Sequence, residues 1–198
     1  MTEIIDGLFL GNFEDARNEP FLSSNRITHI LSAAKEISPF VLDKYTYLHI
    51  KLKDKENFEL TPFLDQAVAF IHRAIKTGGR VLVHCYAGVS RSASLVIAFL
   101  IRSKHLQVLE ALELCQLKRP VVNPNKGFLE KLTLYSKLVH DPLDSLTPQD
   151  LDKKSDSPAC KFALKNPMKK DYDSSPNSFN RFFQNHFGNH SFKEDFKI

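Results

Sequence analysis

Cysteines, tryptophans and long apolar runs are scarce in this sequence. The 198 residues include three cysteines and no tryptophan. Three is too small and too odd a number for a disulfide framework, so we expect free thiols and a reducing compartment, with the cytoplasm as the expected location and the nucleus as a second one. The longest uninterrupted apolar stretch, residues 95–101, is far shorter than the ~18 residues that a membrane span needs. We therefore expect neither a disulfide-rich secreted fold nor a membrane span.

A charge excess of one sign and metal-ligand patterns are also lacking. The 27 basic and 23 acidic residues give a formal net charge of +4, too balanced for nucleic-acid binding as the main role. The histidines show no metal-ligand spacing, and no His-Glu-x-x-His occurs. Neither Gly-x-x-x-x-Gly-Lys nor Gly-x-Gly-x-x-Gly is present. We therefore expect no metal, no cofactor and no nucleic-acid partner.

The composition changes near residue 141. A length of 198 residues allows one domain of catalytic size with an appendage. Residues 142–198 contain five of the ten prolines and seven of the 16 phenylalanines, but only five Leu, Ile or Val, too few to build a core. We predict a catalytic domain over residues 1–141 and a disordered tail, rich in Phe, Asn and Lys, over residues 142–198. The scattered aromatic residues could bind a protein partner, and a low-complexity tail without a partner is the alternative.

Strand and helix signals alternate through the first 141 residues. Residues 27–32, 45–52 and 81–84 have the β-branched and aromatic composition of strands. The spacing predicts a helix that begins after Thr61 as its N-cap and ends at Gly78 and Gly79. It predicts further helices over about residues 92–103, 108–117 and 127–139, the first apolar nearly all round and hence buried. These signals predict an α/β fold of three layers, with a central, mostly parallel sheet flanked by helices.

Residues 81–92, VLVHCYAGVSRS, form the candidate phosphate-binding segment. A buried strand leads to Cys85, a loop with Gly88 follows, and Arg91 and Ser92 begin the buried helix. The loop amides then converge at the positive end of a helix, which favours binding of a tetrahedral anion. Arg91 adds a planar fork of donors for phosphoryl oxygens. We expect a phosphoryl group above the Cys85 sulfur, bound by Tyr86, Ala87, Gly88, Val89, Ser90 and Arg91.

The same positive field favours a thiolate, so Cys85 is a candidate nucleophile toward phosphorus. The alternative is an inert core thiol. The Ser92 hydroxyl can point at the sulfur and stabilise it as a leaving group. We interpret His84 as a buried hydrogen-bonding residue that fixes the loop, and not as a base. For Cys115, which has the helical spacing of a core position, packing is favoured over a role as redox partner of Cys85.

Residues 84–92 contain His-Cys, five residues, Arg and Ser, and so resemble the signature of the cysteine-dependent protein phosphatases. Residues 5–11, 27–31 and 123–128 resemble segments of the small atypical dual-specificity phosphatases, and the resemblance covers about residues 1–139. It implies dephosphorylation of phosphotyrosine and of phosphoserine or phosphothreonine in proteins. It also implies a phosphocysteine intermediate and phosphoprotein substrates.

The resemblance also implies a general acid about thirty residues before the cysteine. Asp54 lies 31 residues before Cys85, after the strand that ends near residue 52. It would protonate the leaving oxygen and then deprotonate the attacking water. A solvated loop carboxylate is the alternative. By the same resemblance, Asn125 would brace the phosphate-binding loop.

Lys51, Lys53 and Lys55 flank Asp54 at alternate positions. They are either solvated surface lysines or a source of preference for acidic residues around the phosphorylated side chain. Two rival functions remain. A phosphatase for phosphoinositides or RNA 5′-phosphates is disfavoured because residues 86–90 contain no lysine. A non-catalytic phosphate-binding scaffold is disfavoured because the chemically active residue types are all present.

Overall fold

A computed structural model describes residues 1–37 and 43–140. All of the described residues belong to one unit, Met1–His140. The predicted tail, residues 142–198, lies outside the described residues. The prediction that this tail binds a protein partner concerns the same residues. Across the described ranges, no helix combines the length and apolar character that crossing a membrane requires.

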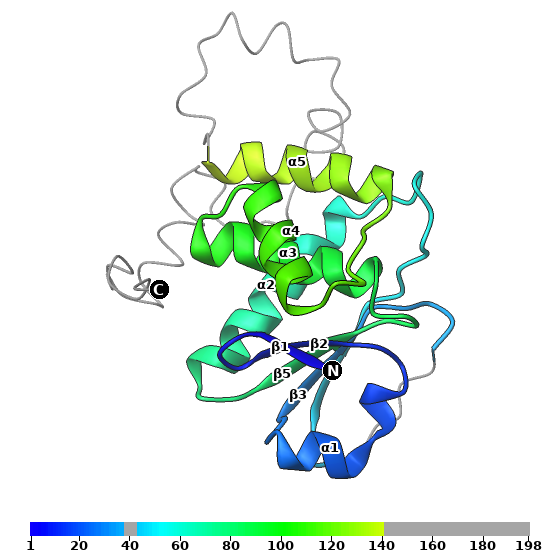
Figure 1. Cartoon of the computed structure of the whole chain (residues 1–198), viewed down its shortest axis with the longest axis vertical. Coiled ribbons are helices and arrows are strands. Elements are labelled where there is room, and N and C mark those ends of the chain that lie inside the picture. Colours follow the sequence, from blue (N-terminus) through cyan, green and yellow to red (C-terminus); the bar gives the residue numbers. More distant parts are fainter. Residues whose placement is uncertain (38–42, 141–198) are drawn as a thin grey trace, which may run out of the picture. The chain divides into compact units, whose positions relative to one another are not determined.

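Five strands form one sheet in the order β1-β2-β5-β3-β4 (Figure 1). Their bounds are β1 Thr2–Ile5, β2 Leu8–Gly11, β3 His29–Ser32, β4 Thr46–His49 and β5 Val81–His84. Strand β1 is antiparallel to β2, and the other neighbouring pairs are parallel. The mostly parallel sheet is thus confirmed, although the sequence pattern assigned no strand to residues 2–11. Strand β3 lies between β4 and β5, so the crossover from β4 to β5 passes over one strand.

Helices cover both faces of the sheet. Their bounds are η1 Asp15–Arg17, α1 Glu19–Ser24, α2 Thr61–Lys76, α3 Arg91–Lys104, α4 Val108–Lys118 and α5 Lys126–His140. Helices α2 to α5 lie together on one side of the sheet, and α1 lies on the other (Figure 1). The predicted N-cap of α2 is wrong: Thr61 is already helical, and Leu60 is the N-cap residue. The Leu60 side chain is completely buried, so apolar packing fixes this helix start without a capping side chain.

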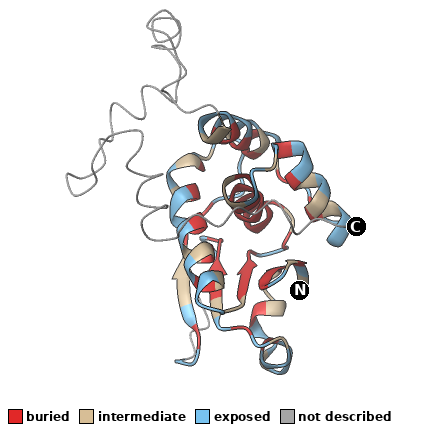
Figure 2. Cartoon of the chain, turned by 90° about the vertical axis from the view of Figure 1, so that its left-hand side faces the viewer, coloured by how far each residue is buried: buried red, intermediate tan, exposed pale blue. Residues whose placement is uncertain are grey.

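Alternate residues of the central strands point to opposite faces of the sheet. Phe9, Ile30 and Leu82 pack in a smaller apolar cluster with residues of η1 and α1. Their neighbours along the strands pack in the larger cluster with α2 to α5, and these are Leu8, Leu10, Leu31, Val81 and Val83. This is the two-residue period of a strand. Burial on both faces is what a parallel sheet requires, and Figure 2 shows buried residues along the strands and on the helix surfaces around them.

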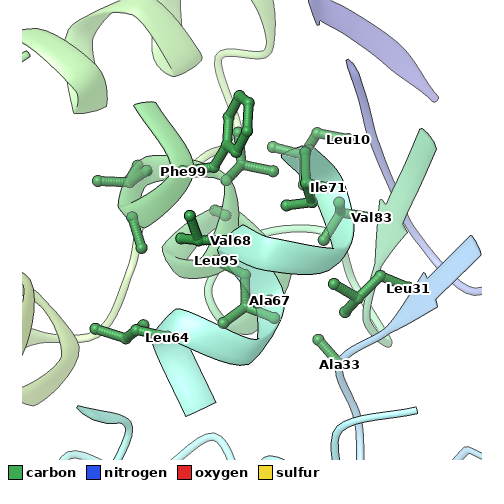
Figure 3. Packing of buried hydrophobic residues seen from close by; sticks show 14 of the residues in the cluster. Leu10, Leu31, Ala33, Leu64, Ala67, Val68, Ile71, Val83, Leu95 and Phe99 are labelled. Atoms are coloured by element: carbon green, nitrogen blue, oxygen red, sulfur yellow. The ribbon is translucent and has the colours of Figure 1, made fainter. Parts of the chain in front are cut away.

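Helix α3 is the central helix of the larger cluster. Residues 91–101 are all buried, as the nearly continuous apolar sequence predicts. Figure 3 shows Leu95 and Phe99 of α3 among Val68 and Ile71 of α2 and Leu10 of β2. Because α3 is packed on all sides, its first residues, which adjoin the end of β5, are held in a fixed position.

The first turn of α5 touches the segment that follows Asp54. A Cβ atom added at Gly127 would lie 2.0 Å from the carbonyl oxygen of Glu56. The same oxygen accepts a hydrogen bond from Lys131 Nζ at 3.1 Å. Helix α5 therefore fixes the backbone two residues beyond Asp54, and only glycine allows this close approach.

Replacing Gly127 by alanine should therefore destabilise the domain. We expect Gly127→Ala to lower the free energy of unfolding by about 1–3 kcal/mol, because the Glu56 backbone must move away from the new methyl group. Urea titration monitored by circular dichroism measures this loss. The exposed neighbour Lys126 provides the matched control, and Lys126→Ala should change the free energy by less than about 0.5 kcal/mol. Equal stability of the two variants would contradict the close packing of Gly127 on Glu56.

Candidate active site

Cys85 directly follows strand β5 and begins the loop that leads into α3. The residue is 1% exposed. Its sulfur accepts a hydrogen bond from the Gly88 amide at 3.3 Å and another from Ser92 Oγ at 3.1 Å. Both donors favour negative charge on the sulfur. The strand, the loop and the first turn of the helix thus all contribute to the surroundings of one sulfur atom.

The loop after Cys85 follows a path that requires glycine. Gly88 has φ +68°, and a Cβ atom there would lie 2.5 Å from the carbonyl oxygen of Gly11. The Gly88 carbonyl accepts a hydrogen bond from Arg119 Nε at 3.2 Å, which holds the loop from the side of α4. The N–H groups of Ala87 and Val89 form no hydrogen bond with any residue that the structure describes. These amides are available to bind phosphoryl oxygens.

Tyr86 lies at the rim of the loop and is 62% exposed. Its ring stacks on Phe13 with 6.5 Å between the centroids, and its carbonyl accepts a hydrogen bond from the Phe13 amide at 3.1 Å. The Tyr86 side chain therefore faces solvent and not the sulfur.

Arg91 is buried, and acceptors hold its guanidinium group. Nη1 donates to Glu36 Oε1 at 2.5 Å and approaches the Leu52 carbonyl at 3.4 Å. Burial of Glu36 raises the pKa of its carboxyl group, but the hydrogen bond from Arg91, a backbone hydrogen bond and the positive charge of Arg91 together bring the pKa below its usual value. Arg91 Nε is buried without a hydrogen-bond partner among the described residues and lies 3.6 Å from Asp54 Oδ2. The guanidinium is thus fixed through Nη1 and keeps a donor for a phosphoryl oxygen.

Asp54, Ser90 and Asn125 form one hydrogen-bonded group. Asp54 Oδ1 accepts hydrogen bonds from Ser90 Oγ and from Asn125 Nδ2, both at 2.8 Å. Ser90 Oγ in turn accepts a hydrogen bond from the Asn125 amide at 3.2 Å. Ser90 is the N-cap residue of α3, yet its side chain makes no cap and binds Asp54 instead. The network engages the carboxylate through Oδ1 and leaves Oδ2 facing Arg91 Nε.

His84 ties the loop to the sheet through its main chain. Its carbonyl accepts a hydrogen bond from the Ala33 amide at 2.7 Å, while Nδ1 of its buried ring has no partner within the described ranges. Burial lowers the pKa of His84 to about 4, and the backbone of Cys85 offsets this only in part. The ring is therefore neutral near pH 7 and brings no charge to the site.

Comparison with known proteins identifies the family. The family model described as dual specificity phosphatase, catalytic domain, matches residues 8–138. The chain belongs to the dual specificity phosphatase family. It is 37% identical over 139 residues to dual specificity protein phosphatase 1B of Arabidopsis thaliana, covering 70% of this chain and 83% of the relative. It is 41% identical over 132 residues to dual specificity protein phosphatase 15 of Mus musculus, covering 67% of this chain but only 56% of that relative.

A solved structure supports the same assignment. The crystal structure of DUSP15 is similar to this phosphatase with a TM-score of 0.67 and 37% sequence identity, over 69% of this chain and 86% of that one. The expected family, the three-layer α/β fold and the expected class of enzyme, a cysteine-dependent protein phosphatase, are confirmed.

Cys115 of the phosphatase is a core residue, as its spacing predicts. It is fully buried in α4, and burial raises the pKa of its thiol to about 12. Such a thiol is a poor partner for redox exchange with Cys85. Within residues 1–37 and 43–140, no three His, Cys, Asp or Glu side chains gather closely enough to bind a metal ion.

Glu36 was not among the residues that the sequence indicated. It lies just beyond the carboxyl end of β3, and Cys85 lies beyond the carboxyl end of the neighbouring parallel strand β5. Ligands in open α/β sheets bind at this edge, so the position of Glu36 after a predicted strand is a usable signal. Its contact with Arg91 depends on the path of the segment after β3, and the sequence pattern does not predict that path.

Proposed function

We propose that this phosphatase removes phosphoryl groups from tyrosine and from serine or threonine side chains of proteins through a phosphocysteine intermediate on Cys85. The observation that carries the proposal is the convergence of the Gly88 amide and the Ser92 hydroxyl on the buried sulfur, with Arg91 beginning the helix that follows the loop. These groups match the needs of a thiolate nucleophile and of a phosphoryl group in transfer.

In the first step, the Cys85 sulfur attacks phosphorus, and the bond from phosphorus to the substrate oxygen breaks. The loop amides and Arg91 bind the three remaining phosphoryl oxygens. Asp54 gives its proton to the leaving oxygen, so the dephosphorylated side chain departs as a neutral hydroxyl. Asn125 and Ser90 hold the Asp54 carboxyl through Oδ1, which leaves Oδ2 for this transfer.

In the second step, the Asp54 carboxylate takes a proton from water as that water attacks the phosphocysteine. The sulfur–phosphorus bond breaks, and inorganic phosphate is released. The Ser92 hydroxyl, 3.1 Å from the sulfur, stabilises the departing thiolate by its hydrogen bond. Asp54 thereby returns to its protonated form for the next cycle.

Replacing Cys85 by serine tests the nucleophile. We expect Cys85→Ser to abolish turnover of p-nitrophenyl phosphate while the domain still binds a phosphotyrosine peptide, because Arg91 and the loop amides are unchanged. Steady-state assays and isothermal titration calorimetry measure the two properties. EDTA should leave the wild-type rate unchanged. Substantial hydrolysis by the variant would show that the thiol is not the nucleophile.

Replacing Asp54 by asparagine tests the general acid. We expect Asp54→Asn to slow hydrolysis of phenyl phosphate strongly, by about 10²-fold or more, and that of activated aryl phosphates less, because a good leaving group needs little protonation. The ratio of wild-type to variant kcat/KM should therefore rise with the pKa of the leaving group. A loss of equal size for all leaving groups would mean that another residue, such as Asp43 or Glu56, supplies the proton.

A further inference from the structure

Three lysines surround a hollow next to the active site. The hollow has a volume of about 300 Å³ and is lined by Lys35, Glu36, Lys53, Asp54, Lys55 and Arg91. Two of these residues, Asp54 and Arg91, belong to the proposed catalytic machinery. A phosphoryl group bound by Arg91 would therefore lie beside this hollow.

Within the part of the chain that the structure describes, no carboxylate neutralises the ammonium groups of these lysines. Lys35, Lys53 and Lys55 are exposed, and none forms an ion pair or side-chain hydrogen bond with any residue of the described ranges. The two carboxylates that line the hollow are already engaged. Glu36 accepts a hydrogen bond from Arg91, and Asp54 accepts two from Ser90 and Asn125. The hollow thus offers three unpaired positive charges to a ligand.

The backbone holds the lysine-bearing segments in place. The Lys35 amide donates to the Leu52 carbonyl at 3.0 Å, which joins the segment after β3 to the segment after β4. The Lys55 amide donates to the Lys53 carbonyl at 3.0 Å and closes a tight turn around Asp54. The three lysines therefore approach the same hollow from two segments that are fixed to each other. Lys51, the third lysine of the alternating pattern, is exposed but does not line the hollow.

We propose that Lys35, Lys53 and Lys55 form a second anion subsite that selects phosphoproteins with acidic side chains next to the phosphorylated residue. This inference rests on the proposed phosphatase function. Exposed ion pairs are individually weak, so each lysine contributes about a two- to fivefold gain in kcat/KM toward an acidic substrate. Because the subsite is exposed, salt screens its effect.

Matched phosphotyrosine peptides test the subsite. One peptide carries glutamates on both sides of the phosphotyrosine, the other carries glutamines, and p-nitrophenyl phosphate serves as a substrate without flanking groups. We expect wild-type kcat/KM to be about tenfold higher for the glutamate peptide, and the ratio to shrink from about 50 mM to about 500 mM salt. The combined variant Lys35→Gln, Lys53→Gln, Lys55→Gln should bring the ratio close to one, with p-nitrophenyl phosphate turnover changed less than about twofold.

The control is Lys51→Gln, which removes one exposed lysine outside the hollow and should preserve the peptide ratio. A charge-reversed variant, Lys35→Glu with Lys53→Glu, should favour the glutamine peptide. An unchanged peptide ratio in the glutamine variant would overturn the subsite while leaving the phosphatase function intact. Absence of p-nitrophenyl phosphate turnover in the wild type would instead overturn the proposed function. The combined glutamine variant could instead lose the wild-type activity on vesicles containing phosphatidylinositol bisphosphate while keeping the wild-type peptide ratio. This result would assign the lysines to a lipid headgroup and would also overturn the proposal.

Discussion

The active site depends on one constraint, which is that the sulfur of Cys85 is buried and must be surrounded by hydrogen-bond donors. The donors come from Gly88 and Ser92, which lie three and seven positions later in the chain. The loop can turn back on the sulfur only because Gly88 adopts φ +68° and packs against the Gly11 backbone. The buried helix α3 then fixes Ser92. Much of the fold, including strand β2 and the packing of α3, thus serves to hold donors around one atom.

A second set of contacts fixes the positions of Asp54 and Arg91. Arg91 comes from α3, Glu36 from the segment after β3, and Asp54 from the segment after β4. A guanidinium that is held by Glu36 through Nη1 keeps its Nε beside the Asp54 carboxylate, which Ser90 and Asn125 hold in turn. The first turn of α5 supports the same arrangement, because Gly127 packs on the backbone just beyond Asp54. Helices and loops that are distant in sequence therefore fix the Asp54 carboxylate relative to the Arg91 guanidinium.

Local patterns were sufficient for helices α2 to α5, for strand β5 and for the Cys85 loop. Period and composition alone place α3, because a helix that is apolar all round must be buried. Strands β1 and β2, which are as long as β5, were not assigned from the sequence pattern. Burial of Leu60 overrode the capping preference at the start of α2. The link between Glu36 and Arg91, and the place of Lys35 in the hollow instead of Lys51, depend on how two loops meet. Such tertiary contacts leave no periodic signal in one sequence.

The most direct test of the proposed mechanism is to locate the phosphoryl group during turnover. Wild-type enzyme mixed rapidly with excess p-nitrophenyl phosphate and quenched within one turnover can be digested and examined by mass spectrometry. We expect the peptide containing Cys85 to gain the mass of one phosphoryl group. The gain should grow in Ser92→Ala, where breakdown of the intermediate is slowed, and should be absent in Cys85→Ser. Turnover without any phosphorylated Cys85 peptide, or a phosphoryl group on another residue, would contradict the mechanism.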